Sequence, residues 1–131
     1  MLFEQSEEGD AACLGLFEGQ VKRFAAADMH DEHGEKLKVP HMGWNQVYQV
    51  NDSKNATHAL WQGIESGTRF YYVHSYYVAP ADEAVVTGYS CYPNQFTSAI
   101  AQNNLFAVQF HPEKSATAGL QLLHNFVNWQ P

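Results

Sequence analysis

Runs of hydrophobic residues, some alternating with polar ones and some continuous, predict a chain built mainly of short strands. Residues 69–78 are dense in aromatic and β-branched side chains, which pack well on a pleated sheet. Residues 85–89 and 96–101 show the same character over shorter lengths. Residues 105–110 are nearly all apolar, which is typical of a strand buried on both faces. Residues 39–47 contain a proline, a glycine and a tryptophan, so we expect an irregular connection leading into a strand.

The end of the chain carries a different period, which predicts one amphipathic helix over residues 116–129. The residues that recur at spacings of three and four, with one neighbour, are Leu120, Leu123, His124, Phe126 and Val127. We expect this stripe to pack on the sheet beside strand 105–110. Near the start, residues 14–24 begin with a turn and end in an alternating stretch that suits a strand, whereas the polar residues 27–38 predict an exposed loop.

Composition narrows the class of protein. The 131 residues suffice for one domain, 1–131, and 45% hydrophobic residues can supply its core. A net charge of −7, with the seven cations dispersed, argues against nucleic acid and anionic membranes as partners. The acidic N-terminal stretch lacks the features of a signal peptide, so we expect a cytoplasmic protein. Cys13 and Cys91 match no zinc spacing, and we assign no metal and no cofactor.

The strongest chemical signal follows the apolar strand 105–110. Pro112 disfavours helical geometry at His111, and in an extended backbone the side chains of His111 and Glu113 point the same way. The carboxylate can then orient the imidazole, which is the base-and-orienter half of a nucleophilic triad. A polar turn without function is the alternative, because short motifs of this kind are common.

Family resemblance favours the functional interpretation. The segment 109–115 resembles the C-terminal signature of class I, triad-type glutamine amidotransferases. With Pro40-His41-Met42-Gly43-Trp44-Asn45 and the aromatic run 70–77, it is similar, in order and spacing, to the glutaminase subunits of imidazole glycerol phosphate synthase. The resemblance runs from residue 1 to residue 129. It implies an α/β fold, namely the C-terminal portion of a flavodoxin-like, three-layer amidotransferase domain whose first strands are missing.

The resemblance also implies an activity and a partner. In that family a Cys-His-Glu triad hydrolyses glutamine, and the ammonia passes to a (β/α)8-barrel cyclase subunit in histidine biosynthesis. By resemblance, His111 is the general base and acid and Glu113 orients it. The residues expected to hold glutamine are Glu8, Ser75, Tyr76 and Tyr77, and those expected toward the cyclase are His41, Met42, Trp44, Asn45 and Lys114.

The family's nucleophilic cysteine is not found in its expected place. Residues 12–16 imitate a Gly-x-Cys-x-Gly elbow, but Cys13 follows a polar stretch and precedes a turn, whereas an elbow needs a buried strand before it and a helix after it. By resemblance, residues 1–9 correspond to the helix after the elbow, which places the nucleophile upstream of Met1. We therefore expect Cys13 to be an ordinary small buried residue and the isolated chain to be inactive.

Several alternatives stay open. His30 and His33 would lie on one face of a helix, but no third metal ligand is evident. The aromatic run 70–77 could stack nucleic-acid bases, although no basic groove accompanies it. For the function, two alternatives remain: an amidotransferase fragment, and a non-catalytic pseudo-amidotransferase that binds a cyclase barrel. A third is a different triad-type amidotransferase, although the segment 40–45 argues against it.

Overall fold

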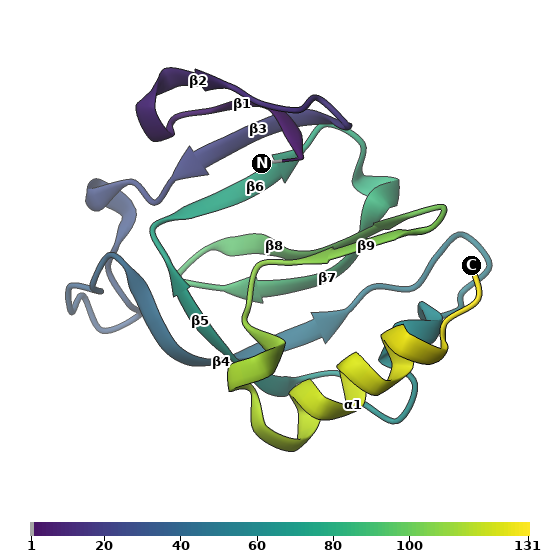
Figure 1. Cartoon of the computed structure of the whole chain (residues 1–131). Helices are drawn as coiled ribbons and strands as arrows, with labels where there is room; N and C mark the ends of the chain where they lie inside the picture. Colours follow the sequence, from purple (N-terminus) through teal and green to yellow (C-terminus); the bar gives the residue numbers. More distant parts are fainter. Residues whose placement is uncertain (1) are drawn as a thin grey trace.

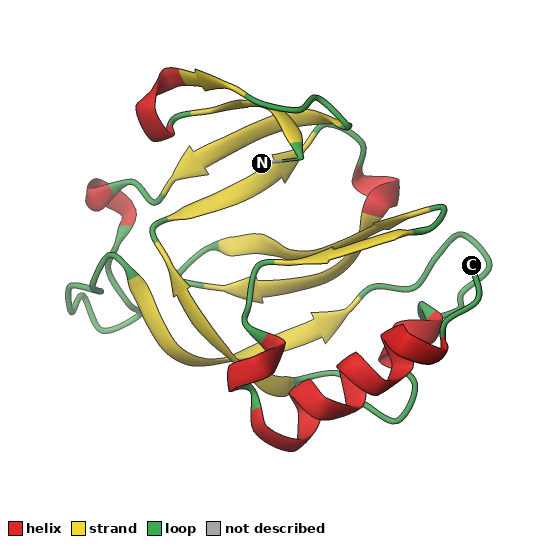
Figure 2. Ribbon diagram, in the orientation of Figure 1, coloured by secondary structure: helices red, strands yellow, loops and turns green. Residues whose placement is uncertain are grey.

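A computed structural model describes residues 2–131 and shows one curved sheet with a single α-helix (Figures 1 and 2). The strands are β1 Phe3–Ser6, β2 Ala11–Ala12, β3 Phe17–Arg23, β4 His41–Gln49, β5 Thr68–His74, β6 Tyr76–Pro80, β7 Val86–Cys91, β8 Gln95–Gln102 and β9 Leu105–Val108. The helix is α1 Ala116–Asn128. Short 3-10 helices span Glu8–Asp10, Ala26–Asp28, Ala59–Trp61, Glu83–Val85 and Pro112–Lys114.

The strand order places the N-terminal strands β1 and β2 at one end of the sheet and the strands β4 and β5 at the other. Along the sheet the order is β2-β1-β3-β6-β8-β7-β4-β5, and β9 pairs with β8. Among the described strands only β1 and β3 pair in parallel, and the other pairs are antiparallel. In Figure 1, β1 and β2 lie at the top, and β4, β5 and α1 lie at the bottom. This mixed sheet with a few helices is consistent with the α/β class that the sequence predicts.

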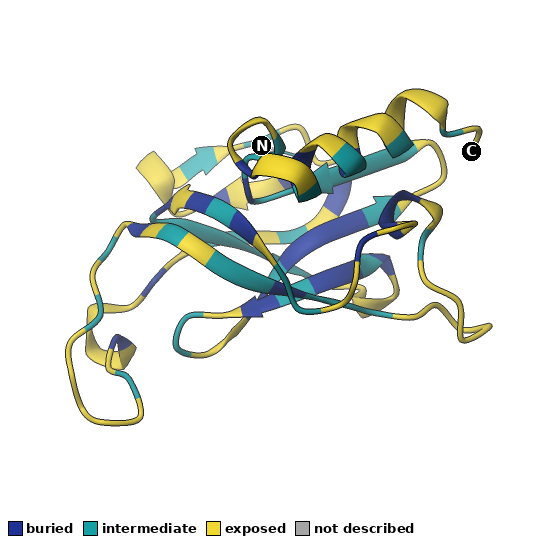
Figure 3. Ribbon diagram, turned by 90° about the horizontal axis from the view of Figure 1, so that it is seen from below, coloured by how far each residue is buried: buried dark blue, intermediate teal, exposed yellow. Residues whose placement is uncertain are grey.

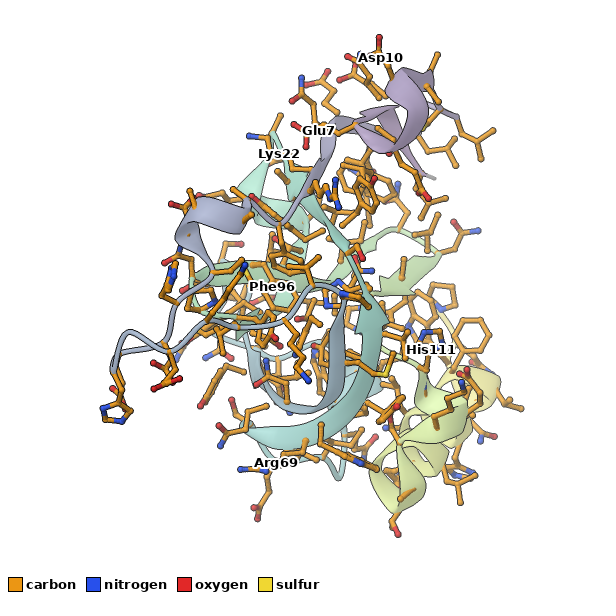
Figure 4. All side chains as sticks on the ribbon, turned by 90° about the vertical axis from the view of Figure 1, so that its left-hand side faces the viewer. Glu7, Asp10, Lys22, Arg69, Phe96 and His111 are labelled. Atoms are coloured by element: carbon orange, nitrogen blue, oxygen red, sulfur yellow. The ribbon has the colours of Figure 1, made fainter. Side chains whose placement is uncertain are left out.

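The core is an aromatic cluster to which β5 contributes its inner face. Because side chains alternate along a strand, Phe70, Tyr72 and His74 point inward, and the intervening Tyr71 and Val73 do not. Phe96 of β8 lies at the centre of the cluster, where Figure 4 labels it. The strands predicted at 85–89 and 96–101 are confirmed as β7 and β8.

Three buried hydroxyl groups form a closed ring inside this core. The Tyr72 hydroxyl donates to Ser98 Oγ at 2.7 Å, and Ser98 Oγ donates to Ser90 Oγ at 2.7 Å. Ser90 Oγ lies 2.7 Å from the Tyr72 hydroxyl, so each group can donate once and accept once. Burial raises the pKa of Tyr72 to about 12, against a smaller lowering by the two serine hydrogen bonds. The ring ties β5 to β7 and β8 without leaving an unpaired polar atom.

The predicted helix at residues 1–9 is wrong for the described residues 2–9. Phe3–Ser6 is strand β1, which pairs with β2 and β3, and Glu8–Asp10 is a 3-10 helix. The Phe3 and Phe17 rings pack 5.7 Å apart, so the strand buries its first residue in a small second core. Met1 lies outside the described residues.

The helix at the end of the chain is confirmed, but its buried face was predicted wrongly. Leu122 and Gly119 are buried, whereas Leu120, Leu123, Phe126 and Val127 are exposed, as the largely yellow helix in Figure 3 shows. Asn125 explains the rotation, because its Nδ2 donates to the carbonyls of Leu60 and Gln62 at 2.8 and 2.7 Å. The helix therefore lies against β5 and the Ala59–Trp61 turn. Among residues 2–131 no helix is long and apolar enough to cross a membrane.

Two strands also differ from their predictions. The run 69–78 is broken at Ser75 into β5 and β6, because the Ser75 carbonyl accepts a hydrogen bond from the Phe24 N–H at 3.1 Å and β6 pairs with β3. β9 is only half-buried, contrary to the two-faced burial predicted for 105–110, because it pairs with β8 alone within the described part of the chain. The polar loop 27–38 is mostly exposed as predicted, although Met29 is buried.

We predict that Tyr72→Phe destabilises the fold by about 1–3 kcal/mol, because it leaves the ring open at two buried serine hydroxyls. Urea unfolding measured by tryptophan fluorescence checks this. Tyr89→Phe, at a half-buried position, is the matched control and should change stability by less than about 0.5 kcal/mol. Equal losses in the two variants would contradict the proposed importance of the ring.

Candidate active site

The candidate catalytic residue His111 is placed by the free edge of β5. Its backbone N–H donates to the Tyr71 carbonyl at 2.9 Å. The Tyr71 N–H in turn donates to Ser115 Oγ at 3.0 Å, and Ser115 Oγ donates to the His111 carbonyl at 2.6 Å. Ser115 is 1% exposed, so water does not compete for these bonds. The two ends of the segment 111–115 are thus both held by the peptide groups of Tyr71 in β5.

Gly119 allows the helix to approach this segment closely. A Cβ atom at Gly119 would lie 1.9 Å from the Pro112 carbonyl oxygen. The Gly119 N–H donates to the Ser115 carbonyl at 3.1 Å, which continues the segment into α1. The abrupt change from strand to 3-10 helix to α-helix therefore leaves His111 at a bend, with its side chain partly exposed. Figure 4 shows His111 next to the start of α1.

His111 and Glu113 are in contact through their side chains. His111 Nδ1 lies 3.0 Å from Glu113 Oε1. The Glu113 backbone N–H and then the His111 imidazole hold the pKa of the Glu113 carboxyl below its usual value, so the group is a carboxylate that only accepts. Nδ1 of His111 must carry the proton, which leaves the Nε2 lone pair to accept one. This geometry is that of a base with its orienting carboxylate.

The residues expected to hold glutamine do not all lie together. Ser75 is the break between β5 and β6, and Tyr76 and Tyr77 are the first two residues of β6, so all three follow directly on the strand that holds His111. Glu8 lies at the other end of the sheet, between β1 and β2. Figure 4 shows this separation, because Glu7 and Asp10, which flank Glu8, lie near the top of the view, well above His111. The arrangement of the described residues gives no support to a role for Glu8 beside His111.

The residues expected toward a partner divide into an exposed and a buried set. Met42 and Trp44 on β4 are 61% and 48% exposed, and Lys114 is exposed next to His111. The Trp44 ring contacts the Tyr71 ring edge-on at 5.9 Å, so this apolar surface adjoins the strand that positions His111. Asn45 is half-buried and donates to the Cys91 carbonyl at 2.8 Å. His41 is only 4% exposed and is not part of this surface.

The structure reveals a buried histidine pair that sequence reasoning missed. His41 and His74 are direct partners in the β4–β5 pairing, and His41 Nδ1 lies 2.7 Å from His74 Nε2. Burial, and then the neighbouring His74, lower the pKa of His41 to about 4. Burial and, more weakly, the charge of His111 lower the pKa of His74 to about 4, against an opposing hydrogen bond to the Tyr76 carbonyl. Both rings are therefore neutral at pH 7. The sequence pattern does not predict the pairing of 41–47 with 68–74, which is what brings the two rings together.

Neither Cys13 nor the pair His30 and His33, which the sequence analysis considered for other roles, joins the His111 site. Cys13 follows β2, and β2 and β5 occupy opposite ends of the sheet (Figure 1). Cys13 is half-buried rather than buried, and its Sγ contacts the Ala11 carbonyl at 3.5 Å. His30 pairs with Lys36 in a short bridge instead of lying on a helix with His33. Across residues 2–131 no three His, Cys, Asp or Glu side chains gather as metal ligands would.

Comparison with known proteins assigns the chain to a family. The model of the family "Glutamine amidotransferase class-I" matches residues 12–129, which include the whole His111–Glu113 site. The chain therefore belongs to the class I glutamine amidotransferases.

Individual relatives narrow the similarity further. The chain is 60% identical over all 131 residues to the imidazole glycerol phosphate synthase subunit HisH of Thiobacillus denitrificans, and covers 55% of that protein. The subunits of Nitrosospira multiformis and Nitrosomonas europaea are 60% and 53% identical over the whole chain, which covers 59% of each. The chain thus spans a little over half the length of the relatives it matches.

We predict that the chain loses stability as the pH falls from 6.5 to 4. Because the folded-state pKa values of His41 and His74 lie near 4 and the unfolded value is 6.5, the unfolded state binds more protons in this window. Stability is full above pH 6.5 and declines by up to about 2.7 kcal/mol per pH unit if both histidines take up a proton. Burial lowers the pKa of His58 as well and acts in the same direction.

Urea unfolding at several pH values measures this slope. His41→Phe should roughly halve the contribution of the pair, whereas His33→Asn, at an exposed position, should leave the slope unchanged. A free energy of unfolding that does not change between pH 6.5 and 5 would show that the pair is not held neutral.

Proposed function

We propose that this chain is part of the glutaminase subunit of imidazole glycerol phosphate synthase, which acts in the cytoplasm in histidine biosynthesis. The subunit would hydrolyse glutamine to glutamate and ammonia, and a (β/α)8-barrel cyclase subunit would use the ammonia. The observation that carries this proposal is the 3.0 Å contact of His111 with Glu113, inside the segment that matches the amidotransferase family. The 60% identity to subunits of that synthase supports the particular reaction.

The contact of His111 with Glu113 supports the following proton transfers. A cysteine thiol from outside this site would give its proton to His111 Nε2, and the thiolate would attack the side-chain carbonyl carbon of glutamine. Glu113 would stabilise the imidazolium that forms. The imidazolium would then protonate the departing nitrogen, so that ammonia leaves and a thioester remains. Water would hydrolyse the thioester, with His111 taking the proton of the water and returning it to the sulfur.

The surroundings of the pair suit the other roles. We assign glutamine binding to Ser75, Tyr76 and Tyr77, because they follow directly on the strand that holds His111. Glu8 keeps its assignment by resemblance alone. The exposed Met42 and Trp44, with Asn45 and Lys114, form the proposed contact with the cyclase, since β4 pairs with β5 and Lys114 lies in the segment that β5 holds. We withdraw His41 from that contact because it is buried.

We predict that the 131-residue chain alone, or with a cyclase subunit added, releases no ammonia from glutamine, because Cys13, which imitates the nucleophile elbow in sequence, follows β2 at the opposite end of the sheet from β5, which holds His111. A chimera that joins the chain to the part of the Thiobacillus denitrificans subunit outside the match should be active. In this chimera, His111→Ala should lower kcat by about 10³-fold or more, and Glu113→Gln by about 10²-fold or more. Coupled detection of glutamate measures the rate.

Glu65→Gln is the matched control, because Glu65 is exposed and belongs to none of these assignments. An active chimera in which His111→Ala has no effect would refute the catalytic assignment. Turnover by the 131-residue chain that Cys13→Ala abolishes would place the nucleophile at Cys13 instead. A chimera that binds the cyclase but never hydrolyses glutamine would favour the non-catalytic pseudo-amidotransferase.

A further inference from the structure

A chain of hydrogen bonds crosses the core from the proposed partner surface to the proposed glutamine-binding segment. Asn45 Nδ2 lies 3.4 Å from His41 Nε2, His41 Nδ1 lies 2.7 Å from His74 Nε2, and His74 Nδ1 lies 2.8 Å from the Tyr76 carbonyl oxygen. Its first member, Asn45, follows the exposed Trp44, and its last atom, the Tyr76 carbonyl oxygen, belongs to the first residue of β6, directly after the break at Ser75.

The chemistry of the last acceptor fixes the direction of every bond in this chain. A carbonyl oxygen can only accept, so His74 Nδ1 carries a hydrogen. In a neutral ring, His74 Nε2 is then bare, and His41 Nδ1 must be its donor. His41 Nε2 is bare in turn and faces the amide nitrogen of Asn45, whose second hydrogen goes to the Cys91 carbonyl at 2.8 Å. Both histidines are Nδ1–H tautomers, and the donors all point toward Tyr76.

The surrounding aromatic rings hold this chain of hydrogen bonds rigidly. His41 is stacked on Tyr92 with ring centroids 3.9 Å apart and on Tyr72 at 4.9 Å. Phe24 and Phe96 contact the His74 ring at 5.1 and 5.2 Å. Two polar rings inside an aromatic cluster lose hydration, and an apolar pair of similar size would fill the space without that loss. A fully satisfied polar chain instead specifies one arrangement of the backbone that it joins.

We propose that His41 and His74 are positioning residues, which hold the backbone of Ser75–Tyr77 in the geometry that binds glutamine by fixing the Tyr76 carbonyl from inside the core. The inference rests on the proposed function for its substrate. His74 acts on this backbone directly, and His41 acts through His74. Neither side chain contacts glutamine, because both are buried.

The tautomers can be tested on the 131-residue chain without any activity. Long-range ¹H–¹⁵N correlation spectra at pH 7 should show His41 and His74 as Nδ1–H tautomers, assigned with His41→Asn and His74→Asn. An Nε2–H tautomer for either residue would overturn the proposal. Amide hydrogen exchange in His41→Phe, which keeps a stacked ring but removes the donor, should speed up at residues 75–77 more than at the core amides of β7 and β8. A uniform change in all these amides would also overturn it.

The consequence for glutamine is tested in the chimera with the cyclase subunit. His41→Phe should raise KM for glutamine about tenfold with kcat changed less than about threefold, as expected when one buried hydrogen bond that orders a binding segment is lost. His41→Asn keeps a donor close to the position of Nδ1 and should recover most of the affinity. A purely structural role would lower the active fraction, and therefore kcat, at constant KM in both variants, and that result refutes the inference.

The two proposals fail in different ways. An unsubstituted chimera without glutaminase activity overturns the proposed function, and with it the substrate named here. An active chimera whose KM is unaffected by His41→Phe overturns this inference and leaves the proposed function standing.

Discussion

The site depends on the backbone of one residue, Tyr71, at the free edge of β5. Its carbonyl accepts from the His111 N–H, and its N–H donates to the buried hydroxyl of Ser115. An edge strand whose peptide groups were left unpaired would invite pairing with another chain, and here the polar groups of Tyr71 are used to hold the candidate base. Since Ser115 also binds the His111 carbonyl, the segment cannot slide along the strand without losing both contacts. The orientation of His111 thus follows from the pairing of β5.

The inner face of the same strand holds two polar assemblies that an apolar core would not need. Tyr72 belongs to the hydroxyl ring, and His74 belongs to the hydrogen-bond chain that ends at Tyr76. Each is completely satisfied, so the cost of burying polar groups is offset and the strands have only one register in which the contacts form. β5 therefore has a fixed position relative to β4, β7 and β8. A strand held in this way is a suitable support for a catalytic group, which needs accurate placement.

Sequence reasoning succeeded where the determining contacts are local. The strands at 85–89 and 96–101 follow from residue type. His111 and Glu113 are in contact as expected, although Pro112–Lys114 is a 3-10 helix and not the extended backbone from which that contact was predicted. Sequence reasoning failed where contacts between residues far apart in the sequence determine the structure. The face that α1 buries is set by Asn125 binding the carbonyls of Leu60 and Gln62, more than 60 residues away. The break at Ser75 depends on Phe24, and the importance of Ser115 depends on Tyr71, so neither leaves a pattern in its own segment.

The three histidines of this region have different surroundings. His111 is partly exposed, and its Nδ1 lies 3.0 Å from Oε1 of the Glu113 carboxylate. His41 and His74 are buried without a carboxylate partner, and their protonation is opposed. The charge of His111 lowers the pKa of His74 further, which also favours the neutral form of the buried pair. A protonated His74 would carry a hydrogen on Nε2 as well. This second donor would face the Nδ1–H of His41 and break the chain of hydrogen bonds. Keeping the pair neutral therefore preserves the hydrogen bond to the Tyr76 carbonyl and the backbone geometry that it supports.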